Sequence, residues 1–215
     1  MNNPGHILLP TAYFPPVSYF VHLVKNPVIY IEQMETFPKQ TYRNRCEIMT
    51  AAGKSNLIVP VTKPHGNHTM TRDIEICYRE PWDQHHLKTI QTAYRSSPYF
   101  NYYSDIIQPL FEPKETSLLL HNQEILSVIS KILRLKLSSQ LTGDYIILPT
   151  YMSDLRSEMI PKKRRSANSF PEYPQVFSHK FGFIADLSIL DLLFNMGPEA
   201  GRYLESIDQE RVVDR

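Results

Sequence analysis

The densest group of side chains that could bind a ligand runs from Lys39 to Arg45. In Lys-Gln-Thr-Tyr-Arg-Asn-Arg, three cations and two carboxamides stand within seven residues. Arginine presents a planar fork of donors that fits phosphate or carboxylate, while Asn and Gln side chains both donate and accept hydrogen bonds. We therefore expect the tract to bind an anionic small molecule through Lys39, Tyr42, Arg43, Asn44 and Arg45.

The same tract has an alternative interpretation as a solvated loop that leads into a hairpin, because a run of charge alone is a weak signal. Phe37 and Tyr42 favour the binding interpretation, since amphipathic rings beside arginines commonly hold the face of a sugar or nucleotide. In that case Arg43 and Arg45 hold a phosphate or carboxylate and Asn44 orients it.

Acid–base chemistry beside such an anion could come from His68 or Asp73, which follow the charged tract. Histidine changes its protonation near neutral pH. His65 and His68 could also ligate a metal ion, but no carboxylate or third histidine stands at a spacing that completes a site, so we expect no metal. Exposed loop histidines are the simpler interpretation.

Asp191 is a further catalytic candidate, because it lies in an apolar helical run where an unpaired carboxylate is costly to bury. If Ser188 is the N-cap, Asp191 occupies the N3 position of a capping box and stabilises the start of the helix. We place this structural role first.

Several reaction classes are disfavoured by motifs that the sequence lacks. No G-x-S-x-G elbow is present, and neither Cys46 nor Cys77 lies in an electropositive stretch, which argues against hydrolase chemistry. The seven glycines form neither a G-x-G-x-x-G nor a G-x-x-x-x-G-K-[ST] loop. We therefore expect no dinucleotide or other cofactor.

The composition is that of an ordinary folded protein: 215 residues, 42% hydrophobic and 21% charged, with a net charge of +1. We expect one domain over residues 1–215. Nucleic acid is not an expected partner, since only Lys162 to Arg165 forms a basic run, and a homo-oligomer is compatible with the sequence. No apolar run has the length of a membrane span, no signal peptide is evident and the two cysteines are isolated, which places the chain in the cytoplasm.

The elements that must position these residues indicate an α/β fold. Apolar segments at 6–10 and 28–31 enclose a helical stretch at 17–24, the pattern of a βαβ unit with parallel strands. Segments 45–50 and 56–61 flank Gly53, which can adopt the positive φ of a hairpin loop. The other expected elements are a half-exposed strand at 73–78, a helix at 84–95, a helix from an Asn122 N-cap to about Leu137, a buried strand at 145–149, a mobile basic loop at 151–172 and a helix at 186–197.

The expected architecture is a Rossmann-like mixed sheet with an antiparallel hairpin insertion and C-terminal helices. In such a fold ligands bind outside the carboxyl ends of the strands. We expect the pocket there, near the turn Tyr13–Pro16 and the tract Lys39–Arg45.

Several separated motifs resemble the WbqC-like family of bacterial proteins and stand in the family's order. They are Tyr13-Phe14-Pro15-Pro16 with Tyr19-Phe20, Lys39 with Arg43-Asn44-Arg45, Trp82 with Ala93-Tyr94 and Ser97-Pro98-Tyr99-Phe100, and the string from Leu187-Ser188 through Asp191, Phe194 and Asn195 to Gly197. The sequence departs from the family pattern at Leu9-Pro10-Thr11, where many members carry His-Gln-Pro or Met-Gln-Pro. The segment 145–173 is also shorter than in longer members.

The resemblance implies a role in surface-polysaccharide (O-antigen) biosynthesis, as a transferase that moves an acyl, aminoacyl or related activated group. Its motifs add Tyr13 and Asn195 to the expected substrate-binding residues. The implied partner is an anionic small molecule such as an activated sugar, acyl or aminoacyl donor. The alternative function is a non-catalytic binding or scaffold protein.

Overall fold

A computed structural model of the chain describes residues 6–112, 115–147, 149, 151–163 and 169–209. Its central sheet has four parallel strands in the order β7-β2-β1-β8. The strands are β1 (His6–Pro10), β2 (Val28–Glu32), β7 (Ser138–Leu141) and β8 (Ser153–Asp154). In chain order they are first to fourth, so the spatial order is third, second, first, fourth, as in a Rossmann fold.

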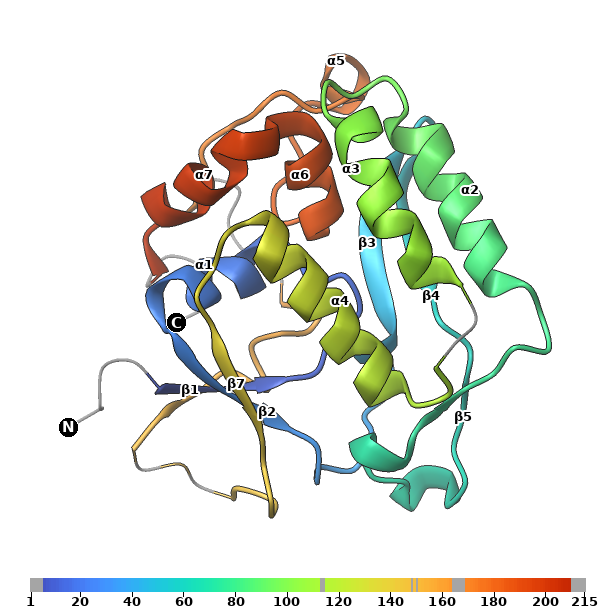
Figure 1. The fold of residues 1–215 in the computed structure, drawn as a ribbon, viewed down its shortest axis with the longest axis vertical. Helices are drawn as coiled ribbons and strands as arrows, with labels where there is room; N and C mark the ends of the chain where they lie inside the picture. The colour runs from blue at the N-terminus through green and yellow to red at the C-terminus, as the bar shows by residue number, and fades with distance from the viewer. Residues whose placement is uncertain (1–5, 113–114, 148, 150, 164–168, 210–215) are drawn as a thin grey trace.

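The predicted βαβ unit is confirmed. Helix α1 (Val17–Lys25) connects β1 to β2, and the two strands pair in parallel from His6 opposite Val28 to Pro10 opposite Glu32. Strand β1 is buried from Ile7 onward, as expected for a central strand whose faces are both covered. Helix α4 (Leu118–Ile132) later returns the chain to the sheet, and its C-terminal end leads into β7 (Figure 1).

Two antiparallel hairpins form small sheets of their own. Strand β3 (Arg45–Thr50) pairs with β4 (Gly53–Ile58), and β5 (Val61–Thr62) pairs with β6 (Glu75–Ile76). Gly53 has a φ of +113°, which is the left-handed conformation expected of it. The α/β class with an antiparallel hairpin insertion is therefore confirmed.

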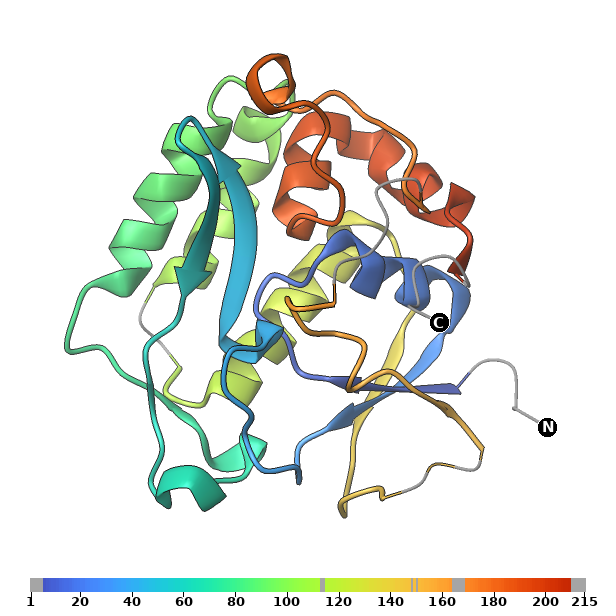
Figure 2. The same cartoon turned by 180° about the vertical axis from the view of Figure 1, so that it is seen from behind.

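The remaining helices form two groups around this framework. Helices α2 (Trp82–Tyr94) and α3 (Phe100–Ile107) stand beside the β3–β4 hairpin, while α6 (Ile189–Met196) and α7 (Ala200–Ser206) lie with α1 (Figures 1 and 2). Shorter helical turns are η1 (Tyr42–Asn44), η2 (Gly66–His68), η3 (Thr71–Asp73), η4 (Gln108–Phe111), α5 (Ser178–Phe181) and η6 (Gly197–Glu199). Among the helices that the structure describes, none has the length and hydropathy required to cross a membrane.

The predicted N-cap of the fourth helix was wrong. Helix α4 begins at Leu118, and its N-cap is Ser117, whose Oγ accepts a hydrogen bond from Leu120 N at 3.3 Å. Asn122 instead lies inside the helix, where its buried side chain donates to the carbonyl of Arg43.

Two predicted strands also differ from the structure. The described part of 145–149 forms no strand, and Tyr145 and Ile147 are 51% and 74% exposed. The expected strand at 73–78 is reduced to β6, because its first residue belongs to η3. The third parallel strand is the polar, exposed β7, which has no apolar run to signal it.

The predicted basic loop at 151–172 contains more structure than its sequence suggested. Strand β8 lies within it, and Leu155 and Met159 are buried. Arg164 and Arg165 of its basic run lie outside the described residues. The mobility of this segment stays a prediction.

Candidate functional site

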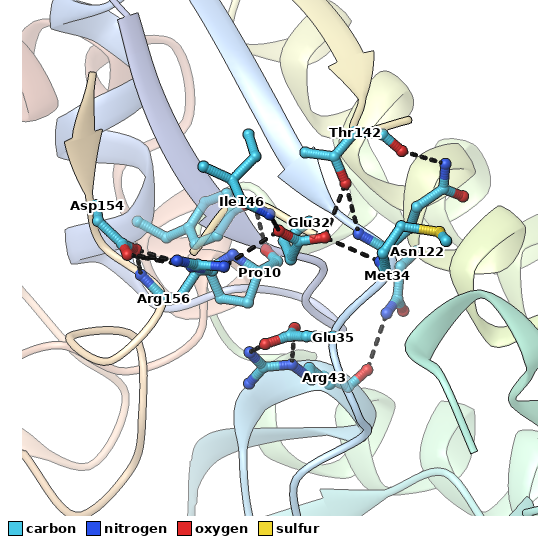
Figure 3. A network of polar contacts seen from close by, with 12 residues as sticks. Pro10, Glu32, Met34, Glu35, Arg43, Asn122, Thr142, Ile146, Asp154 and Arg156 are labelled. Carbon is cyan, nitrogen blue, oxygen red and sulfur yellow. Dashed lines mark hydrogen bonds and ion pairs between the residues drawn. The ribbon is translucent and has the colours of Figure 1, made fainter. Parts of the chain in front are cut away.

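The site is built around Glu32, the last residue of β2, whose carboxylate is fully buried. Its Oε1 accepts hydrogen bonds from Thr142 Oγ1 at 2.8 Å and from Met34 N at 2.9 Å, and its Oε2 accepts from Arg156 Nη1 at 3.1 Å and Ile146 N at 3.2 Å (Figure 3). A buried carboxylate must be compensated in this way. Glu32 therefore anchors the chain that follows β7 to the carboxyl end of β2.

Arg156 connects this anchor to the surface. Its Nη2 donates to Asp154 Oδ2 at 2.6 Å and its Nε to Asp154 Oδ1 at 3.0 Å, while the guanidinium carbon lies 5.0 Å from the centre of the Tyr145 ring. The hydrogen bonds to Asp154 raise the pKa of Arg156. Partial burial acts to raise the pKa of Asp154, but the hydrogen bonds from Arg156 outweigh it and hold that pKa below its usual value.

A second buried ion pair joins Arg43 of η1 to Glu35. Arg43 Nε donates to Glu35 Oε1 at 2.7 Å, and its Nη2 donates to Oε2 at 2.8 Å. Burial raises the pKa of Glu35 and lowers that of Arg43, and the attraction between the two groups offsets only part of this effect. The Arg43 carbonyl accepts from Asn122 Nδ2 at 2.8 Å, which fixes η1 against α4.

These two ion pairs border a pocket of about 490 Å³ that we call the edge pocket. It is lined by Glu35, Pro38, Lys39, Gln40, Thr41, Arg43, Tyr145, Asp154, Arg156, Ser157, Ile160 and Lys162. Thr41 is buried, and its Oγ1 has no hydrogen-bond partner among the described residues.

The edge pocket lies outside the carboxyl ends of the parallel strands. Glu32 ends β2 and Asp154 ends β8, on opposite sides of β1. From β1 the chain continues to β2 on one side of it, whereas β8 pairs with β1 on the opposite side. The strand order therefore reverses between β1 and β8. Such a switch point is where open α/β sheets bind their ligands.

The structure brings together only some of the predicted substrate-binding residues. Lys39 and Arg43 line the edge pocket. Asn44 does not, because its Nδ2 donates to the carbonyl of Val59 at 2.9 Å, and Arg45 begins strand β3. Tyr42 is buried and borders a different pocket.

Tyr13 is fully buried and does not line the edge pocket. Its hydroxyl is 2.9 Å from His86 Nδ1, and its ring stacks on His121 with 5.9 Å between the ring centres. Trp82 packs edge-on against both imidazoles. Burial lowers the pKa of His86 and of His121 to about 4, so both are neutral at physiological pH. His86 and Trp82 are therefore core residues.

Asp191 and Asn195 lie within α6, away from the edge pocket. Ser188 is the N-cap as predicted, with its Oγ accepting from Leu190 N at 3.4 Å. The capping-box role of Asp191 was wrong, because its carboxylate accepts from Tyr173 Oη at 2.7 Å and from Gln175 Nε2 at 2.8 Å. Burial raises the pKa of Asp191 to about 6. Asn195 Nδ2 donates to the Asp191 carbonyl at 2.8 Å.

The two other acid–base candidates do not line the edge pocket. His68 is exposed in η2, and Asp73 ends η3, where it lies 3.4 Å from Arg72 Nε. Within the residues that the structure describes, no group of three or more His, Cys, Asp or Glu side chains could hold a metal ion.

Sequence reasoning missed Glu32, Glu35, Asp154 and Arg156. An acidic residue directly after a predicted parallel strand is a usable signal for Glu32, since the ends of parallel strands face the site. No such signal marks Asp154 and Arg156, because β8 has only two residues.

A parallel sheet in the order third, second, first, fourth, with a charged pocket at its carboxyl edge, defines an α/β protein of Rossmann-like topology. The chain belongs to the WbqC-like protein family, which it matches over residues 11–161. The match includes Lys39, Arg43 and Arg156 and ends before the string Leu187–Gly197.

The chain is also similar to the uncharacterized protein Rv1507c of Mycobacterium tuberculosis (strain ATCC 25618 / H37Rv). The two are 25% identical over 232 residues, which cover 92% of this chain and 96% of the relative. No solved structure gives a significant match.

Proposed function

We propose that the edge pocket binds the anionic part of an activated donor, and that the protein transfers an acyl, aminoacyl or related group from this donor in surface-polysaccharide biosynthesis. The observation that carries the proposal is an excess of cations in the pocket. Its four cationic side chains are Lys39, Arg43, Arg156 and Lys162, and its two carboxylates are Glu35 and Asp154. A volume of about 490 Å³ suits a small molecule.

The cations of the edge pocket differ in how firmly they are held. Arg43 and Arg156 are fixed by their carboxylate partners, and the hydrogen bonds of Arg43 to Glu35 use Nε and Nη2 but not Nη1. Lys39 and Lys162 are exposed. Fixed guanidinium groups position a phosphate or carboxylate, while mobile lysines add charge at the rim.

Transfer requires a proton acceptor beside the donor. The hydroxyl or amine of the acceptor substrate forms a bond to the activated carbonyl carbon of the donor. The bond between that carbon and the leaving group then breaks, and the leaving group keeps the electron pair. The cations of the edge pocket stabilise its negative charge. Glu35 is the carboxylate best suited to take the proton, because burial raises its pKa. Asp154 suits this role less, because Arg156 holds its pKa low.

Titration calorimetry with nucleotide sugars, acyl-coenzyme A and inorganic pyrophosphate tests the proposed binding. We expect Lys39→Ala to raise the dissociation constant of the ligand roughly tenfold, since a charge-assisted hydrogen bond contributes about 1.5 kcal/mol or more. Lys88→Ala, which removes an exposed lysine of α2, is the matched control and should bind as the wild type does. Equal loss in both variants, or no saturable binding to any ligand, would contradict the proposal.

The chemical step is tested with a ligand that binds. Glu35→Gln keeps the shape of the side chain and removes the proton acceptor. We expect mass spectrometry to show transfer to the sugar acceptor by the wild type and not by this variant. Because the amide oxygen of Gln accepts only one of the two hydrogen bonds from Arg43, calorimetry should show some loss of donor affinity, smaller than the loss of transfer.

A scaffold function has one observation in its favour. Tyr102 and Ile106, one helical turn apart on α3, are 70% and 47% exposed and form an apolar surface strip. A stoichiometric protein partner in quantitative pull-down experiments, together with no small-molecule ligand, would favour this alternative.

A further inference from the structure

A second pocket of about 490 Å³, which we call the aromatic pocket, lies on the other side of η1 from the edge pocket. It is lined by Tyr42, Glu47, Met49, Gly53, Lys54, Pro161, Lys163, Phe181, Phe183, Ile184, Ala185 and Asp186. The proposed donor site does not use any of these residues.

Two chain segments separate the pockets. In η1 and the residue before it, Thr41 and Arg43 line the edge pocket while Tyr42 lines the aromatic pocket. Along 160–163, Ile160 and Lys162 line the edge pocket, whereas Pro161 and Lys163 line the aromatic pocket. Neighbouring residues that line different pockets place the two pockets on opposite sides of these segments.

The apolar lining is positioned by a turn at Gly182. This glycine ends α5 with a φ of +71°, and Phe181 and Phe183 flank it. The Phe183 ring packs edge-on against Tyr173 with 5.2 Å between the ring centres. Both phenylalanines are partly exposed, and Met49 of β3 adds a third apolar side chain. Such a surface suits a ligand with an apolar face.

The charges of the aromatic pocket are balanced and already engaged within the protein. Lys54 Nζ lies 2.8 Å from Glu47 Oε2, and Lys163 pairs with Glu158. Asp186 Oδ1 accepts from Ser18 N at 2.7 Å. Two cations and two carboxylates therefore leave no excess charge in the lining, in contrast to the edge pocket.

We propose that the aromatic pocket binds a neutral sugar. The C–H faces of the sugar ring would stack on Phe181 and Phe183, and its hydroxyls would exchange hydrogen bonds with the charged rim. This binding does not depend on the proposed transferase function, because η1 and residues 160–163 stand between the aromatic pocket and the edge pocket.

The experiment is a titration of the full chain with a neutral 4-nitrophenyl glycoside. Binding is monitored by the amide chemical shifts in nuclear magnetic resonance spectra. We expect saturable shifts at Gly53 and Gly182. Phe181→Ala and Phe183→Leu should each raise the dissociation constant at least fivefold. Tyr102→Ala, which removes an exposed ring of α3 outside the pocket, should leave the constant unchanged.

Shifts confined to other regions, no saturable binding, or equal affinity in the phenylalanine variants and the control would overturn the proposal. Phe181→Ala guards against misfolding, because the Phe181 ring contacts the lysine beside it rather than the core. A parallel titration with pyrophosphate reports on the edge pocket alone. Glycoside binding without pyrophosphate binding would contradict the proposed donor site but not the sugar site. Pyrophosphate binding without glycoside binding would contradict only the sugar site.

Discussion

The buried carboxylate of Asp191 shows how one residue can couple stability to pH. Tyr173 and Gln175 donate hydrogen bonds to it, yet burial raises its pKa from 3.8 to about 6. Between these two pH values the folded chain binds more protons than the unfolded chain. The stability contributed by this group is therefore fully present below about pH 4 and is lost as the pH rises through 6.

Asp191→Asn should remove this pH dependence while keeping an oxygen that accepts from Tyr173. The free energy of unfolding of the wild type, relative to the variant, should fall by about 2 kcal/mol between pH 4 and pH 7. Urea denaturation at several pH values measures the difference in unfolding free energy between the wild type and the variant. The contributions of His86 and His121 cancel in this difference, because both proteins contain these residues. Asp105→Asn, which changes an exposed carboxylate of α3, is the control. A constant difference across the pH range would show that the pKa is not raised.

At the scale of an element, the end of α6 depends on Gly197. This residue has a φ of +54°, and a Cβ atom built on it would lie 2.5 Å from the ring of Tyr99. The carbonyl of Phe194, in the last turn of α6, also accepts from Tyr99 N at 3.0 Å. The end of α6 thus packs directly on the residue that precedes α3.

Gly197→Ala should destabilise the protein by at least about 2 kcal/mol, because it combines a strained φ with overpacking. Gly201→Ala in α7 is the matched control, since its Cβ would meet only an ordinary contact 3.7 Å from the Leu133 carbonyl oxygen. In a helix, that exchange should stabilise by up to about 1 kcal/mol. Thermal unfolding compares the two, and opposite signs are the expected result. Equal effects would mean that α6 can end without the contact to Tyr99.

At the scale of the whole molecule, Glu32 joins chain segments that are more than a hundred residues apart. Its carboxylate binds the segment after β7 and, through Arg156, the segment after β8. Thr142, Ile146 and Arg156 are thereby held at the carboxyl edge of the sheet, where Tyr145, Asp154 and Arg156 line the edge pocket.

Glu32→Gln should cost about 3 kcal/mol, because one oxygen of the fully buried carboxylate becomes an NH2 group that faces hydrogen-bond donors instead of accepting from them. Asp154→Asn, which alters the other partner of Arg156, should cost less than about 1 kcal/mol, since the Asp154 side chain is 34% exposed. Denaturant unfolding gives both values, and limited proteolysis should show faster cleavage within 142–163 only for Glu32→Gln. Similar losses in the two variants would argue that Glu32 has no special role in holding this segment.

The sequence by itself determined the elements whose signals are local. The βαβ unit from His6 to Glu32 has apolar strands on either side of a short helix, and the positive φ of Gly53 and the N-cap at Ser188 depend on neighbouring residues only. Each is decided within a few residues of chain, so composition and spacing were sufficient to predict it.

Only the tertiary structure decided the rest. Strands β7 and β8 are short and carry polar residues, so they become strands because β2 and β1 offer them hydrogen-bonding partners. The same reason divides the charged tract: Lys39 and Arg43 line the edge pocket, whereas the ladder of β3 and β4 takes up Arg45. One site contains Glu32, Glu35, Asp154 and Arg156 because the order of the strands in the sheet brings the ends of β2 and β8 to the same edge. That order cannot be read from the sequence.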